Sequence, residues 1–194
     1  MTTTQVSAPA ALAVSLDDAA ASLRLEADEL ADVTPLLSLT IGAITQEAEH
    51  QVQRAFISRP MRVTLDRFPV IGGLPGAIRL DGAPVASIES ISYRDEAGQM
   101  QTLDPQDYEA DKVSSPGWAM IGYGKAWPAT QDRANAVTVD YTAGYGADHT
   151  SVPECARQYI LLRLADLWDP ASRKFGETVA SAWAERLLDP LRVF

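Results

Sequence analysis

Two changes in hydrophobic period divide the chain into helical, β-type and again helical stretches, and they constrain its fold most. Between Thr34 and Phe56, apolar residues recur every three or four positions, as on one face of an α-helix. From residue 58 to about 146, short alternating runs between Gly, Pro, Asp and Asn are typical of strands and turns. Helical spacing returns after Ser151. The pattern predicts an α+β fold: a small core, with N-terminal helices packed on a C-terminal helix, and a β-rich insertion between them.

The same pattern predicts how the chain is organised. We expect a flexible N-terminal arm over residues 1–14, because this stretch consists mainly of small residues, with one proline and little to bury. The N-terminal core helices are expected over 15–57, the β-rich insertion over 58–150 and the C-terminal core helix over 151–170. A last helix and an apolar tail are expected over 171–194.

Capping residues predict where the helices begin. Ser15 precedes two acidic residues, an arrangement that favours a helix start. Thr34 precedes Pro35, and proline is tolerated in a first helical turn, so the long helix is expected to begin there. Ser151 and Glu154 have the spacing of a capping box.

Two features of the middle stretch predict strand pairing. The run Val85–Tyr93 is followed by the turn Asp95–Gly98 and then by Gln99–Leu103, which predicts a hairpin. The run Ala136–Tyr141 has the clearest alternation in the chain, with Val137 facing one way and Thr138 the other.

Composition excludes several classes of protein. Apolar residues make up 46% and charged residues 22%, which is ordinary for a globular chain. The single cysteine, Cys155, cannot form an internal disulfide. The net charge is −10, with eight acidic and two basic residues among the first 56, so nucleic acid or anionic lipid is not expected to cover the surface. With no cationic leader and no apolar run near the ~20 residues of a membrane helix, we expect synthesis in the cytoplasm and no membrane partner.

The motifs that suggest chemistry are better explained as turns or core. Gly72, Gly73 and Gly76 are not followed by a helix, so they lack the positive helix end that binds phosphate. The stretch Gly122–Lys125 lacks the hydroxyl that follows the lysine of a nucleotide-binding loop. Cys155 begins an apolar helix and is expected to be structural. We therefore expect no catalytic residue, no cofactor and no metal site.

Aromatic residues concentrate in the β-type stretch without a basic stripe between them. Stacking on single-stranded nucleic acid requires such a stripe. These residues are therefore expected to pack in sheets or to form a protein contact, because aromatic side chains anchor protein interfaces. They are Tyr93, Tyr108, Trp118, Tyr123, Trp127, Tyr141 and Tyr145.

The order of several short motifs resembles that of the tailed-phage head–tail connector (adaptor) family, also found in phage-like gene transfer agents. The motifs are Ser15-Leu16-Asp17-Asp18-Ala19, Gln53-Arg54-Ala55-Phe56, Ile91-Ser92-Tyr93-Arg94-Asp95 with Gly98, Tyr108 with Asp111, Trp127-Pro128, Val137 to Gly146, and Val152-Pro153. The sequence Tyr141-Thr142-Ala143-Gly144-Tyr145-Gly146 followed by Val152-Pro153 is the most specific part. The resemblance covers roughly residues 15–170.

This resemblance implies a structural virion protein rather than an enzyme. Connector subunits form a ring, typically dodecameric, under the portal protein, where they extend the DNA channel and present a surface to the next neck or tail protein. The implied partners are the portal, neighbouring copies and that downstream protein, while DNA passes without sequence-specific binding. The implied location is the virion neck at the head–tail junction, after synthesis in the host bacterial cytoplasm.

Two sets of residues are candidates for the contacts of such a protein. We expect an apolar C-terminal set to dock on the portal, with folding back onto the chain's own core as the alternative: Trp183, Leu187, Leu188, Leu191, Val193 and Phe194. We expect Trp118, Tyr123 and Trp127 to contact a neighbouring subunit or a tail-side partner.

Two other functions stay open at this point. A tail-side completion or terminator protein would share the neck location but bind the tail tube. A small hydrolase would use paired carboxylates, such as Asp17 with Asp18 or Glu47 with Glu49, if the fold brought them into one pocket. Cap and turn positions explain most of these carboxylates without any catalytic role.

Overall fold

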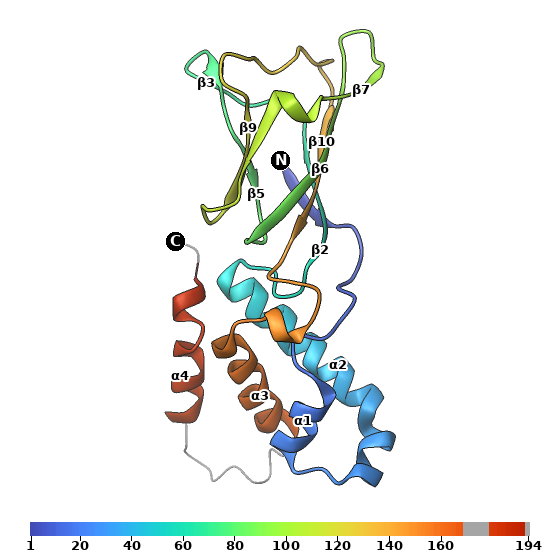
Figure 1. Cartoon of the computed structure of the whole chain (residues 1–194), viewed down its shortest axis with the longest axis vertical. Coiled ribbons are helices and arrows are strands. Elements are labelled where there is room, and N and C mark those ends of the chain that lie inside the picture. Colours follow the sequence, from blue (N-terminus) through green and yellow to red (C-terminus); the bar gives the residue numbers. More distant parts are fainter. Residues whose placement is uncertain (169–178, 193–194) are drawn as a thin grey trace. The chain divides into compact units, whose positions relative to one another are not determined.

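The computed structural model describes residues 1–168 and 179–192 (Figure 1). The chain forms two compact units, each with its own core. The first, called the β unit, comprises Met1–Ala8 and Ser58–Gly144. The second, called the helical unit, comprises Pro9–Ile57 and the chain from Tyr145 onward. Helices and antiparallel sheets are both present, so the expected α+β class is confirmed.

The helical unit contains four α-helices among its described residues: α1 (Leu16–Leu23), α2 (Ala27–Val52), α3 (Glu154–Trp168) and α4 (Val179–Arg186). Two short 3-10 turns, η2 (His149–Ser151) and η4 (Asp189–Leu191), precede α3 and follow α4. The apolar stripe of α2 packs against α3, as its spacing predicts. The buried residues from these two helices are Leu37, Ile41, Ile44, Ala48, Val52, Ala156, Tyr159, Ile160 and Leu164.

The start of α2 corrects the sequence prediction. The helix begins at Ala27 rather than at Thr34, because Glu26 and Glu29 form a capping box upstream. Pro35 lies inside the helix, where it cannot donate to the preceding turn. Pro35 and Ala31, the residue whose carbonyl loses this partner, are both exposed. Thr34 does not cap, and its Oγ1 donates to the Leu30 carbonyl at 2.7 Å.

The other two predicted helix starts have different outcomes. Ser15 is confirmed as the N-cap of α1, since its Oγ accepts from the Asp18 N–H at 3.0 Å. Ser151 instead ends the turn η2, whose own cap is Asp148. The first carbonyl of α3 to accept a helical hydrogen bond is that of Pro153, from the Arg157 N–H at 3.1 Å.

A buried carboxylate closes the C-terminal end of α2. Glu49 exposes only 8% of its surface, and its Oε1 accepts from the Phe56 N–H at 2.6 Å. Its backbone carbonyl accepts from Arg54, at 3.2 Å, and from the left-handed C-cap Gln53. Glu49 therefore fixes the turn by which the chain leaves the helix.

The β unit contains two main sheets and a small hairpin. The five-stranded sheet has the order β1 (Thr2–Gln5), β2 (Arg59–Leu65), β10 (Val137–Ala143), β6 (Val85–Arg94) and β7 (Met100–Thr102), with every pair antiparallel. The three-stranded sheet has the order β5 (Ile78–Leu80), β9 (Gly117–Ile121) and β8 (Tyr108–Asp111). A short hairpin pairs β3 (Val70–Ile71) with β4 (Leu74–Pro75), and a 3-10 turn, η1 (Pro105–Asp107), precedes β8.

Alternation along β2 and β10 places one face of the large sheet in the core. Val63 lies opposite Val139 in the register, and both are fully buried. On the other face Arg62 lies opposite Asp140, and the guanidinium Nε donates to the carboxylate at 2.7 Å. This ion pair raises the pKa of Arg62, mainly through its hydrogen bond to Asp140. The alternation predicted for the β10 segment is therefore confirmed.

The predicted hairpin is confirmed, whereas the predicted arm is not. The strands β6 and β7 pair across a turn in which the Asp95 N–H donates to the Gln99 carbonyl at 3.0 Å. Residues 2–5, expected to be a loose arm, form β1 instead. Their polar threonines suit an edge strand, because threonine is β-branched and one side of the strand faces water. The Thr3 Oγ1 also donates to the Asp81 carboxylate at 2.7 Å, which ties the strand to the rest of the β unit.

Replacing the buried carboxylate tests its place at the end of α2. We expect Glu49→Ala to lower the free energy of unfolding by about 2 kcal/mol, because the buried Phe56 N–H loses its acceptor. Asp32→Ala, an exposed acid of the same helix, is the matched control and should change stability by under about 0.5 kcal/mol. Urea unfolding followed by circular dichroism measures both, and equal midpoints for the two variants would contradict the assignment.

Candidate functional site

A stack of aromatic rings organises one loop region of the β unit. The Trp127 ring lies parallel to the Phe68 ring, with their centroids 4.6 Å apart, and Phe68 meets Tyr93 edge-on at 5.7 Å. The Trp127 Nε1 donates to the Gly76 carbonyl at 2.8 Å. Because Phe68 precedes the β3–β4 hairpin and Gly76 follows it, the indole holds both ends of the hairpin.

The same hairpin presents apolar side chains to solvent. Val70 is 66% exposed and Ile71 is 71% exposed. The two glycines that follow, Gly72 and Gly73, have φ values of +59° and +82°, so the tight turn depends on their freedom to adopt left-handed conformations. The hairpin was not among the sequence-predicted contacts, because its glycines were interpreted only as part of a turn.

The three aromatic residues predicted to form a contact differ in their surroundings. Tyr123 is fully exposed in the loop after β9. Trp118 is half-buried in β9, opposite Arg79 of β5 and Asp111 of β8. Trp127 is half-buried in the stack and has an internal role. The structure thus leaves Tyr123 the most accessible of the three, and their contact with a partner stays a prediction.

The predicted C-terminal docking set is divided by burial. Leu188 is fully buried and Leu191 is 9% exposed, and both belong to the core of the helical unit. The Leu191 carbonyl also accepts from Arg54 Nε at 2.5 Å. The alternative of folding back therefore describes these two residues, because their side chains complete the chain's own core.

The other members of that set are placed differently. Leu187 is partly buried against the same core, and Trp183 is 54% exposed. Val193 and Phe194 lie outside the described residues. Docking of this segment on a portal stays a prediction, and the exposed indole of Trp183 is the described member that a partner could reach without unfolding the segment.

An exposed apolar face of α2 was missed by the sequence analysis. Leu36 is 58% exposed and Leu39 is 71% exposed, three residues apart on the side of α2 away from its buried stripe. Their presence outside the periodic stripe was a signal that could have identified them. Exposed apolar groups that gather on one face are a feature of interaction surfaces.

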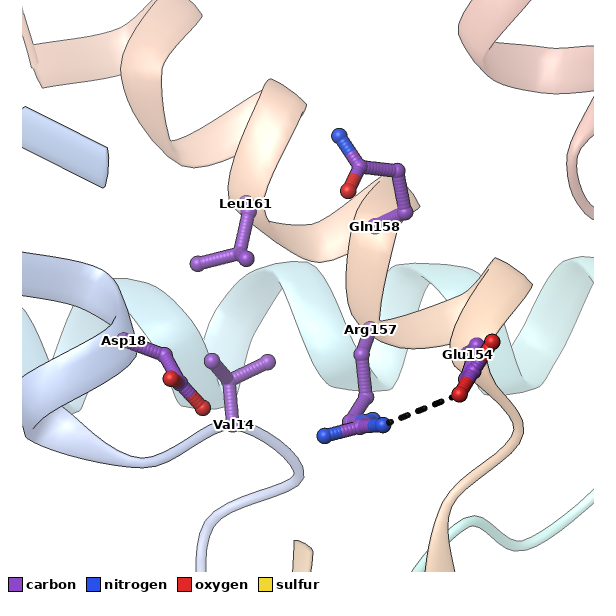
Figure 2. Close-up of a pocket in the computed structure, with 6 residues that line it drawn as sticks. All are labelled: Val14, Asp18, Glu154, Arg157, Gln158 and Leu161. Atoms are coloured by element: carbon purple, nitrogen blue, oxygen red, sulfur yellow. Dashed lines mark ion pairs between the residues drawn. The ribbon is translucent and has the colours of Figure 1, made fainter. Parts of the chain in front are cut away.

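A hollow of about 280 Å³ lies between the start of α1 and the first turns of α3 (Figure 2). Val14 and Leu161 supply its apolar walls. Arg157 and Glu154, both in α3, form a distant ion pair of 4.0 Å, and the Arg157 Nε is buried without a hydrogen-bond partner. Asp18 adds a second carboxylate. The side chain of Glu154 is 95% exposed and Asp18 is also exposed, so neither carboxylate of the hollow is desolvated.

Several shifted pKa values in the β unit and at η2 have structural causes. The pKa of Asp111 is lowered by hydrogen bonds from Ser114 and from the Val113 backbone, which close the loop after β8. The pKa of Asp148 is lowered mainly by Thr150 in the turn η2. Burial raises the pKa of Tyr141, whose hydroxyl donates to the Asp81 carbonyl at 2.9 Å. Each group thus satisfies a turn or a core contact and is not aimed into the hollow described above.

Within residues 1–168 and 179–192, no group of three or more His, Cys, Asp and Glu side chains is arranged to hold a metal ion. None of the helices in this described part of the chain has the length and apolar character needed to cross a bilayer.

This chain is similar to known proteins in its three-dimensional structure. No family model and no curated protein matches the sequence. A chain in the neck of an empty gene transfer agent particle, computed with C6 symmetry, superposes with a TM-score of 0.81 at 22% identity. A chain in the virion of a native gene transfer agent particle gives 0.72 at 23% identity, and one in the neck of the native particle, computed with C12 symmetry, gives 0.73 at 22%. Each match covers 100% of this chain and 96% of the other. At these identities, the likeness shows a shared fold over the whole length.

The aromatic stack yields a test that separates internal from accessible aromatic residues. We expect Trp127→Phe to lower the free energy of unfolding by about 1 kcal/mol, because the Gly76 carbonyl loses its donor while the stack remains. Tyr123→Ala should leave stability within about 0.5 kcal/mol of the parent, since its ring is fully exposed. Denaturant unfolding gives both values. A larger loss for Tyr123→Ala than for Trp127→Phe would be inconsistent with this placement.

The C-terminal segment yields a second test. Leu188→Ala should cost about 3 kcal/mol, because it opens a cavity in the core of the helical unit. Trp183→Ala, on the preceding helix, should cost under about 1 kcal/mol because the indole is largely in solvent. Thermal and denaturant unfolding compare the two variants, and similar losses would mean that the segment is not folded onto the core as described.

Proposed function

We propose that this chain is a structural component of the neck of a phage-like particle, present as a ring of copies that joins the head to the tail. The observation that carries the proposal is the full-length fold match to chains of gene transfer agent necks, with a TM-score of up to 0.81. Two of those structures were computed with C6 and C12 symmetry, which supports a ring. The proposal assigns the chain a structural rather than a catalytic role.

Within the neck, we assign the chain to the head–tail connector position beneath the portal protein. The motif order from the Ser15 helix start to Val152-Pro153 supports this position, since it resembles the connector family. The acidic surplus also suits a channel through which DNA passes, because acidic residues repel phosphate and prevent retention. A tail-side completion or terminator protein is the second candidate, since it would share the neck location.

Binding to the portal protein of the same gene cluster tests this assignment. We expect the full-length chain to co-sediment stoichiometrically with assembled portal rings and to add a further ring visible by electron microscopy. If micromolar chain leaves the portal unchanged but binds tail tubes, the connector position is wrong and the tail-side candidate takes its place.

A further inference from the structure

The five-stranded sheet ends in two strands whose outer edges are open. The order β1–β2–β10–β6–β7 places β1 at one end and β7 at the other, and no other described strand pairs with their outer sides. Backbone N–H and C=O groups on such an edge are a template for another strand.

Hydrogen bonds in the ladders identify the outward-facing residues of β1. The Val6 N–H donates to the Pro60 carbonyl, so Val6 faces the neighbouring strand β2. Because successive residues of a strand present their backbone groups to opposite sides, Thr4 also faces β2, while Thr3 and Gln5 face outward. Two N–H and two C=O groups are thus presented on this edge.

Hydrogen bonds to β6 identify the outward-facing residues of β7. The Leu103 N–H donates to the Ile91 carbonyl, and the Gln99 carbonyl accepts from the Asp95 N–H. Residues 99, 101 and 103 therefore face β6, and Met100 and Thr102 present their backbone groups outward. All three residues of β7 are exposed, so nothing in the described chain covers this edge.

Neither edge carries the features that usually prevent strand addition. The strands read TTTQ and MQT, without charge or proline. Edge strands of monomeric proteins are usually protected by lysine, by other charges, by proline or by bulges. In the three-stranded sheet of the same unit, the edge strands do carry charges: Arg79 in β5, and Glu109 and Asp111 in β8.

The strand directions fit a second copy of the chain. Four successive antiparallel pairings separate β1 from β7, so the two edge strands run in the same direction. The β7 edge of one copy can therefore pair, parallel, with the β1 edge of the next, which continues the sheet with strands of unchanged orientation. A contact between two different surfaces of the same chain repeats head to tail, and it gives a ring when the rotation closes.

We propose that copies of this chain join by pairing the outward side of β1, at Thr3 and Gln5, with the outward side of β7, at Met100 and Thr102, of the neighbouring copy. The inference rests on the proposed function, which requires a ring, and it adds the surface that builds the ring. A second copy is the occupant because every copy supplies both edges. Each edge is uncharged and has two outward-facing residues, and the two edge strands run in the same direction.

Proline substitutions test the pairing because they remove an outward N–H without changing the inward ladder. Gln5→Pro and Thr102→Pro each delete one donor on one edge, at positions where proline is compatible with an edge strand. Gln5→Ala and Thr102→Ala keep the N–H and are the matched controls. We expect the alanine variants to form portal-bound rings and each proline variant to form none. The Gln5→Pro variant keeps an intact β7 edge, and the Thr102→Pro variant keeps an intact β1 edge. An equimolar mixture of the two should therefore give dimers and no rings.

Amide hydrogen exchange of the unmodified protein gives a readout that does not depend on the folding of any variant. The amides of Gln5 and Thr102 should exchange at least roughly tenfold more slowly in the ring than in the free chain, while the inward amide of Gln101 should change less. Rings formed equally well by the proline variants, or unchanged exchange at both amides, would overturn the edge pairing alone. A parent chain that forms no ring with its portal would overturn the proposed connector function, and the edge pairing with it.

Discussion

The antiparallel ladder between β2 and β10 is the constraint on which the rest of the structure depends. It pairs seven residues of each strand, from Leu65 with Val137 to Arg59 with Ala143, although more than seventy residues separate the two strands in sequence. The first and last strands of the long β segment are thereby held side by side at its entry and exit. Because the segment begins and ends at one place, the helical unit can be built from two distant pieces of chain. Within that unit, the bridge between Ile57 and Gly146 joins the two pieces directly.

The helical unit in turn depends on how its segments end. The Glu49 carboxylate and the αL residue Gln53 terminate α2 within a few residues, so that Phe56 and Ile57 reach the core. The C-terminal turn then adds Leu188 and Leu191 to the same core. The surfaces left for partners among the described residues are the exposed leucines of α2, the indole of Trp183, the β3–β4 hairpin and the two sheet edges. Of these surfaces, only the two sheet edges can pair with each other, because their strands run in the same direction.

The sequence was informative where one face of a segment is buried. The period of α2, the alternation of β10 and the hairpin of β6 and β7 could all be predicted, since burial imposes a repeating pattern on side chains. Predictions failed where the decisive group was a backbone donor or a distant partner. The strand β1 has no apolar alternation, because its pairing depends on backbone groups and on Asp81, and the start of α2 is set by the Glu26–Glu29 box rather than by Pro35. Of the candidate contact residues, Leu188 and Leu191 were apolar because they belong to the core, which a list of apolar residues cannot distinguish from a docking surface.

The proposed place of this chain in the particle neck is tested most directly by the position of the chain on intact particles. A short epitope inserted after Val113, which is 95% exposed between β8 and β9, would mark the chain without entering either sheet. Electron microscopy of labelled particles should show antibody at the head–tail junction of each particle. Antibody found on the capsid surface, on the tail shaft or only on free protein would contradict the account.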